Sequence, residues 1–162
     1  MIVLVMGVSG SGKTTIGEAL ARELGWKYLD ADDYHSPENV AKMAAGVPLE
    51  DSDRWPWLEK INEELLKIQK QGKSAVIGCS ALKHAYRERL ARGLRDFEIV
   101  YLRGDFALIQ SRIAARKHRF MPAALLQSQF DALEPPAHAI EVDVSAPVES
   151  SLSEIKNQLP QS

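Results

Sequence analysis

The chain has 162 residues, and its 20 lysines and arginines nearly balance its 22 aspartates and glutamates. With a formal net charge of −2 and both signs intermixed, it lacks the overall field that would favour nucleic acid or a membrane surface, so we expect a small-molecule partner. A single cysteine, Cys79, excludes an internal disulfide and a four-cysteine metal site, and favours a reducing, cytoplasmic location. The length predicts one domain over residues 1–162.

Short apolar or β-rich segments alternate with helical patterns along the chain. We expect strands at residues 2–6, 27–30, 74–78, 97–102 and 139–143. We expect helices at residues 13–24, 37–45, 55–71, 83–94, 106–116, 122–130 and 148–159. This alternation predicts a three-layer α/β/α fold, in which a five-stranded parallel sheet has helices on both faces. Ligands of such sheets bind beyond the carboxyl ends of the strands.

The first strand leads directly into a phosphate-binding motif, Gly-x-x-x-x-Gly-Lys-Thr, at residues 7–14. The residues expected to bind ATP there are Gly7, Val8, Ser9, Gly10, Ser11, Gly12, Lys13 and Thr14. Glycines let backbone N–H groups point at phosphate oxygens, Lys13 can reach the β- and γ-phosphates as a catalytic residue, and the Thr14 hydroxyl can hold Mg²⁺. The alternative is a glycine-rich turn without a ligand. The order of strand, loop and helix favours a nucleoside triphosphate.

Two carboxylates, Asp30 and Asp32, follow the second strand. In an extended chain they would project to the same side, toward the phosphate loop. A kinase that acts on an alcohol needs one carboxylate to orient or accept the hydroxyl proton, and often another near the metal. We assign Asp32 to the acceptor hydroxyl, as a catalytic and substrate-binding residue, and Asp30 to Mg²⁺. The alternative is a solvated strand end or a helix cap.

Residues 30–58 are expected to bind the acceptor. Asp53 fits the N-cap of the helix at 55–71, and Arg54 can bind a substrate carboxylate through two parallel hydrogen bonds. His35 is a further candidate for substrate contact, although a lone histidine is more often an ordinary surface residue.

Two cations, Lys83 and Arg87, sit four residues apart in the helix expected after the third strand, and so share one face of it. At the carboxyl edge of the sheet they could bind an anionic acceptor. The alternative is a solvated basic face.

Three arginines, Arg112, Arg116 and Arg119, are spaced by four and three residues around the end of the helix at 106–116. Phosphoryl transfer builds negative charge on the γ-phosphate, and arginines that close over it stabilise the transition state and exclude water. We therefore expect a short lid over residues 112–122, with Arg112 and Arg116 binding ATP and Arg116 acting in catalysis. The alternative is that these cations only complement the helix dipole.

The motifs of the chain resemble those of the gluconokinases over nearly its whole length. The likeness rests on Gly7-Val8-Ser9-Gly10-Ser11-Gly12-Lys13, Asp30-x-Asp32, Asn39-x-x-Lys42-Met43-x-x-Gly46-x-Pro48-Leu49, Cys79-Ser80-Ala81-Leu82-Lys83-x-x-Tyr86-Arg87 and Ser128-Gln129-Phe130-x-x-Leu133-Glu134. The Lys-Met-x-x-Gly-x-Pro-Leu and Cys-Ser-Ala-Leu-Lys blocks are the more specific ones, because many families share the phosphate loop.

The resemblance implies a P-loop fold like that of the nucleoside monophosphate kinases, a homodimer, and Mg²⁺-dependent transfer of the γ-phosphate of ATP to the 6-hydroxyl of D-gluconate. Gluconate carries a carboxylate at the end opposite its reacting hydroxyl. Arg54, Lys83 and Arg87 are therefore candidates for substrate contacts, and residues 143–147 are expected to border the adenine. The family commonly reads Lys-Gly-His-Phe where this chain has Lys-His-Arg-Phe at 117–120, so the lid lacks a glycine.

We therefore expect an ATP-dependent phosphotransferase with an alcohol group as acceptor. A kinase for another small hydroxy acid, such as shikimate, would also use an Asp-x-Asp after the second strand. A nucleotide-switched binding protein is less favoured, because the chain has no Asn-Lys-x-Asp or Thr-Lys-x-Asp motif for guanine and no Asp-x-x-Gly switch motif. The intact Lys13, Asp30 and Asp32 argue against a catalytically silent module.

Overall fold

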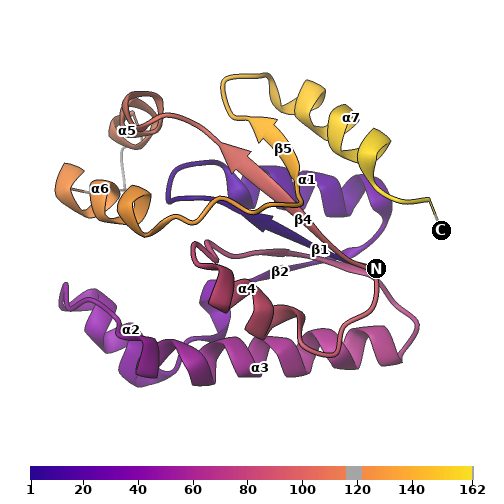
Figure 1. Cartoon of the computed structure of the whole chain (residues 1–162), viewed down its shortest axis with the longest axis horizontal. Coiled ribbons are helices and arrows are strands. Elements are labelled where there is room, and N and C mark those ends of the chain that lie inside the picture. The colour runs from indigo at the N-terminus through magenta and orange to yellow at the C-terminus, as the bar shows by residue number, and fades with distance from the viewer. Residues whose placement is uncertain (116–121, 162) are drawn as a thin grey trace.

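The computed structural model describes residues 1–115 and 122–161. Five parallel strands form one sheet in the order β2-β3-β1-β4-β5 (Figure 1). The central strand β1 (Ile2–Met6) pairs with β3 (Ala75–Gly78) and with β4 (Phe97–Arg103), and the outer strands are β2 (Lys27–Asp30) and β5 (Ile140–Asp143). The predicted five-stranded parallel sheet is confirmed.

Helices cover both faces of the sheet, which confirms the three-layer arrangement (Figure 1). They are α1 (Lys13–Leu24), the short 3₁₀ helix η1 (Ala31–Tyr34), α2 (Pro37–Ala44), α3 (Asp51–Lys70), α4 (His84–Ala91), α5 (Phe106–Ala114), α6 (Ala123–Ala132) and α7 (Val148–Gln158). Helices α1, α5, α6 and α7 pack on one face, and α3 and α4 pack on the other. In the described parts of the chain, no helix is both long and apolar enough to span a membrane.

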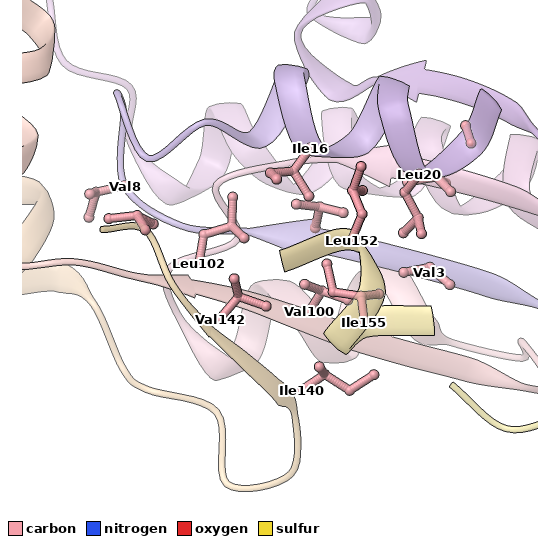
Figure 2. Packing of buried hydrophobic residues seen from close by; sticks show 14 of the residues in the cluster. Val3, Val8, Ile16, Leu20, Val100, Leu102, Ile140, Val142, Leu152 and Ile155 are labelled. Atoms are coloured by element: carbon pink, nitrogen blue, oxygen red, sulfur yellow. The ribbon is translucent and has the colours of Figure 1, made fainter. Parts of the chain in front are cut away.

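All five residues of β1 are fully buried, because the strand lies in the middle of the sheet with helices above and below it. Val3 and Val5 pack toward α1 and α7, whereas Ile2, Leu4 and Met6 pack toward α3 and α4. Figure 2 shows the first of these clusters, in which side chains of α1 and α7 meet those of the strands. Helices thus cover the centre of the sheet on both faces. The carboxyl edge of the sheet is the place where ligands of such folds bind.

Helix α3 begins at Asp51, earlier than the sequence predicted. Its N-cap is Glu50, whose backbone N–H donates to the Asp53 carboxylate at 2.9 Å. The prediction of Asp53 as the N-cap is therefore wrong: Asp53 lies in the first turn and satisfies a donor just before the helix. Pro56 consequently falls inside the helix.

Asn62 links α3 to the end of α4 from a buried position. Its Nδ2 donates to the carbonyls of Leu90 and Arg92, at 2.8 Å each. We predict that Asn62→Ala lowers the free energy of unfolding by about 1–3 kcal/mol, because both carbonyls lose their donor. Chemical denaturation measures the change, with Asn157→Ala on the exposed face of α7 as the matched control. Equal stability of the two variants would contradict this role.

Candidate functional site

The loop between β1 and α1 has the backbone that a phosphate-binding loop requires. Gly10 and Gly12 have φ angles of 82° and 98°, in the left-handed region that favours glycine. A Cβ on Gly10 would lie 2.6 Å from Ile113 of α5, so close packing also demands glycine there. The Lys13 ammonium donates to the carbonyls of the first two loop residues, at 3.0 Å each. The cation predicted to bind phosphates is therefore held against the loop.

A first cavity, of about 400 Å³, lies at the carboxyl ends of β2 and β3. Lys13 and Thr14 line it from the phosphate loop, Asp30 and Asp32 from the end of β2, and Ser80 from the loop after β3. The structure thus brings together the predicted phosphate, metal and acceptor-hydroxyl residues. One space holds an ammonium, a hydroxyl and two carboxylates, which is the set of groups that phosphoryl transfer to an alcohol uses.

A second cavity, of about 410 Å³, lies on the other side of the phosphate loop. Its walls include Val142, Val144 and Pro147, and Arg112 lines it as well. A space with both apolar and polar walls next to a phosphate loop suits a flat heterocycle joined to phosphates. The prediction that residues 143–147 border the adenine is compatible with this position.

The sequence predicted an extended chain through Asp30 and Asp32, and the structure differs from this prediction. The chain turns into η1 after Asp30, whose carboxylate accepts the Asp32 N–H at 2.9 Å and caps the short helix. A helix cap was the alternative to a metal-binding role for this residue. Asp30 is such a cap, and it also lines the first cavity. The Asp32 side chain is 84% exposed, so it is open to a ligand in that cavity.

His35 is not an ordinary surface residue. Its ring stacks on Trp57 with centroids 4.1 Å apart, and its side chain is 4% exposed. Asn39 Nδ2 lies 3.3 Å from Nδ1, and Nε2 lies 3.9 Å from the Asp32 carboxylate. Burial lowers the pKa of His35, against a smaller opposing effect of Asp32. Direct contact with a substrate stays a prediction, because the ring packs behind Asp32 and is absent from the lining of the first cavity.

Arg54 and Lys83 gather around one aromatic ring, that of Tyr86. The Arg54 guanidinium lies 5.5 Å from the ring centroid, and the Lys83 ammonium lies 5.9 Å from it. The Tyr86 hydroxyl donates to Asp51 at 2.5 Å, and Arg54 contacts the same carboxylate at 3.3 Å. The hydrogen bond from Tyr86 is the main reason that the pKa of Asp51 is lowered. Two cations with one carboxylate leave this place net positive, which suits an anionic group.

Arg87 occupies neither of the positions that the sequence suggested. It is 4% exposed, and its Nη1 donates to the carbonyls of Ala81 and Leu82, at 2.8 and 3.1 Å. Its Nη2 donates to the carbonyl of Glu134 at 2.8 Å. The guanidinium donates to three backbone carbonyls inside the fold. It therefore supports the loop after β3 rather than facing solvent or an acceptor. The predicted common face with Lys83 is also absent, since Lys83 is the N-cap of α4.

The predicted lid falls largely outside the described residues. Arg112, in the last turn of α5, lines the second cavity. Arg116 and Arg119 lie outside the described residues, and their predicted roles stay predictions.

Sequence reasoning assigned no role to Gln129, which the structure places against the phosphate loop. The Ser9 N–H donates to its Oε1 at 2.7 Å, and its Nε2 donates to the Ser9 hydroxyl at 3.0 Å. Gln129 belongs to a motif of the resembling family, but a contact across 120 residues has no signal in local spacing.

Comparison with known proteins shows the family of the chain. The family described as "AAA domain" (AAA_33) matches residues 2–136. The probable gluconokinase of Mus musculus is 49% identical, over 95% of this chain and 92% of its own. The thermosensitive gluconokinase of Escherichia coli (strain K12) is 45% identical, over 87% of this chain and 75% of its own.

A solved structure supports the same assignment. The crystal structure of a gluconokinase from Sinorhizobium meliloti 1021 superposes with a TM-score of 0.85, at 40% sequence identity, over 94% of this chain and 87% of that one. Identity at this level over most of both chains shows common descent as well as a common fold. The chain belongs to the gluconokinase family of P-loop kinases.

Proposed function

We propose that this chain is a gluconokinase, which transfers the γ-phosphate of ATP to the 6-hydroxyl of D-gluconate and yields 6-phospho-D-gluconate and ADP. The observation that carries the proposal is the first cavity, where the phosphate loop and Asp32 line one space. The names of the relatives specify the acceptor. The loop after β3 leads from this cavity to Lys83, beside Arg54, so cations are available for the acceptor carboxylate.

The nucleotide would span both cavities. The backbone of residues 7–14 would bind its phosphates, Lys13 would neutralise the β- and γ-phosphates, and the second cavity would take the adenine. Arg112 lines that cavity and would contact the nucleotide from α5. We keep Arg116 as a catalytic candidate for the charge that develops on the γ-phosphate.

Thr14 and Asp30 would hold Mg²⁺ together with the phosphates. Both line the first cavity, and hydroxyl and carboxylate oxygens are the ligands that Mg²⁺ prefers. Across residues 1–115 and 122–161, no group of three or more His, Cys, Asp or Glu side chains could hold a metal ion. That fits a site that is completed by phosphate oxygens, as is usual for Mg²⁺. When bound, the ion would supply positive charge that neutralises the phosphates.

Transfer would occur in line, without a phosphoenzyme. Asp32 would orient the 6-hydroxyl and accept its proton, while the hydroxyl oxygen bonds to the γ-phosphorus and the bond from phosphorus to the ADP oxygen breaks. His35 packs behind Asp32 with its pKa lowered by burial, so it is neutral near pH 7.

We further propose a homodimer in the cytoplasm. The family likeness suggests the dimer, and the use of a single cysteine suggests a reducing compartment.

The acceptor is tested by ADP release with Mg²⁺-ATP and D-gluconate. Parallel assays contain shikimate, glycerate, another aldonic acid or no acceptor. We expect release that depends on gluconate. ADP release with a different acid would support kinase activity but contradict gluconate as the acceptor. Equal release without acceptor would favour an ATPase or a nucleotide switch.

Asp32→Asn tests the proton acceptor. We predict that kcat falls by about 10²-fold or more, while the affinity for ATP stays nearly unchanged, because the amide cannot take the hydroxyl proton. The matched control is Asp33→Asn, an exposed neighbour in η1 that is absent from the lining of the first cavity. A kcat for Asp32→Asn close to that of the control would remove Asp32 from this role.

Arg54→Met tests the carboxylate end of the acceptor. We predict that KM for gluconate rises by about tenfold or more, whereas KM for ATP stays within about twofold, because a charge-assisted hydrogen bond is lost only to gluconate. Turnover of D-glucitol, which has a hydroxymethyl group in place of the carboxylate, should change little. An equal loss for both acceptors would show that Arg54 acts on the fold rather than on the carboxylate. Arg22→Met, on the exposed face of α1, is the control.

A further inference from the structure

The end of α6 contacts both loops that bound the first cavity. On one side, Gln129 bonds to Ser9 in the phosphate loop with both ends of its amide, at 2.7 and 3.0 Å. Two bonds from one planar group fix its orientation as well as its distance from the loop. The phosphate loop is thus held by a helix from the far part of the chain (Figure 1).

Ser9 is a phosphate-loop residue that lies in the same cavity as the carboxylates. It lines the first cavity with Asp30 and Asp32, whereas the second cavity is lined from Gly10 onward. Under the proposed function, the γ-phosphate and the acceptor hydroxyl meet in the first cavity. Gln129 therefore holds a part of the loop that lines the cavity in which they would meet.

Glu134, just past the end of α6, contacts the acceptor loop, which we define as residues 79–83. Its backbone N–H donates to the carbonyl of Leu82 at 2.8 Å, and its own carbonyl accepts from Arg87 at 2.8 Å. Its carboxylate accepts the N–H of His84, the first residue of α4, at 2.7 Å. The end of the acceptor loop is thus bound from the same segment that binds the phosphate loop.

The acceptor loop needs this support, because Ala81 has a φ of 43°, which residues other than glycine rarely adopt. Arg87 donates to the carbonyls of Ala81 and of the next residue. Ser80, which lines the first cavity, precedes the strained residue, and Lys83 ends the loop beside Tyr86. The positions of both side chains depend on a turn that is held from outside.

We propose that Gln129 and Glu134 are positioning residues for the two reactants. Gln129 sets the phosphate loop, Glu134 sets the acceptor loop, and the end of α6 between them fixes their separation. Both act through other residues, and the proposal rests on the proposed function. Near-attack geometry is demanding, since a misplacement of about 1 Å can cost about 10²-fold in rate.

Gln129→Met tests the first contact, because methionine keeps the length of the side chain and removes both hydrogen bonds. We expect kcat to fall by at least about tenfold, with KM for gluconate and the calorimetric Kd for ADP within about threefold of wild type. The control is Gln127→Met on the same helix, whose amide bonds to Asp131 at the exposed surface. A kcat equal to that of the control would overturn the role of Gln129, as would a proportional loss of ADP binding and turnover.

Glu134→Ala tests the second contact. We expect KM for gluconate to rise by about tenfold, with the Kd for ADP unchanged, because the loop that ends at Lys83 loosens. Glu134→Gln keeps an oxygen that accepts the His84 N–H, and it should recover most of the loss. Asp131→Ala is the control. No rise in KM, or no recovery in Glu134→Gln, would overturn the role of Glu134.

The wild-type assay separates this proposal from the proposed function. If wild type shows no ADP release that depends on gluconate, the acceptor is wrong, and the variants are compared on the acceptor that the panel identifies. If wild type phosphorylates gluconate and both variants match their controls, the function holds and the positioning roles are wrong.

Discussion

The site depends on the register of three parallel strands. Val5 of β1, Gly78 of β3 and Asp30 of β2 lie in one row of the sheet. The phosphate loop, the acceptor loop and the turn into η1 therefore leave the sheet at nearly the same level. The absence of a side chain at Gly78 leaves room for the Tyr28 hydroxyl, which a Cβ there would displace. Backbone hydrogen bonds thus bring the three loops together before any side chain takes part.

The cations of the site form two groups, one at the phosphate loop and one around Tyr86. Lys13 is held against the phosphate loop, whereas Arg54 and Lys83 lie around Tyr86. Asp32 lines the cavity beside the phosphate loop, with its carboxylate exposed. A molecule with a hydroxyl at one end and a carboxylate at the other matches this distribution of charge. The burial that lowers the pKa of His35 disfavours a further positive charge beside the Asp32 carboxylate.

Local pattern was enough to predict the sheet and the phosphate loop. The phosphate loop could be recognised within a dozen residues, from the apolar run at 2–6, the glycines at 7–12 and Lys13. The strands lie close to the positions that the alternation of apolar and helical segments predicted. The local geometry that the sequence did not predict depended on where the chain turns. Asp30 caps η1 because the chain bends directly after it, and Asp53 lies inside α3 because that helix starts at Asp51.

Arg87 and Gln129 show a second limit of sequence reasoning. Arg87 was predicted to share a solvated or acceptor-binding helix face with Lys83, because the two residues lie four apart. It is buried because backbone carbonyls of two distant segments meet around it. Gln129 bonds across 120 residues to Ser9, and spacing within one helix holds no trace of such a partner. Arg87 and Gln129 both belong to motifs that resemble the family. Only the fold shows which loop each of them contacts.

The most direct test of the account is a crystal structure of the protein with Mg²⁺, D-gluconate and a non-hydrolysable ATP analogue. The account predicts the 6-hydroxyl within about 3 Å of the Asp32 carboxylate and in line with the γ-phosphate, a geometry that proton transfer and displacement both require. It also predicts the gluconate carboxylate beside Arg54 or Lys83. Gluconate bound in the reverse direction, or a 6-hydroxyl out of reach of Asp32, would contradict it.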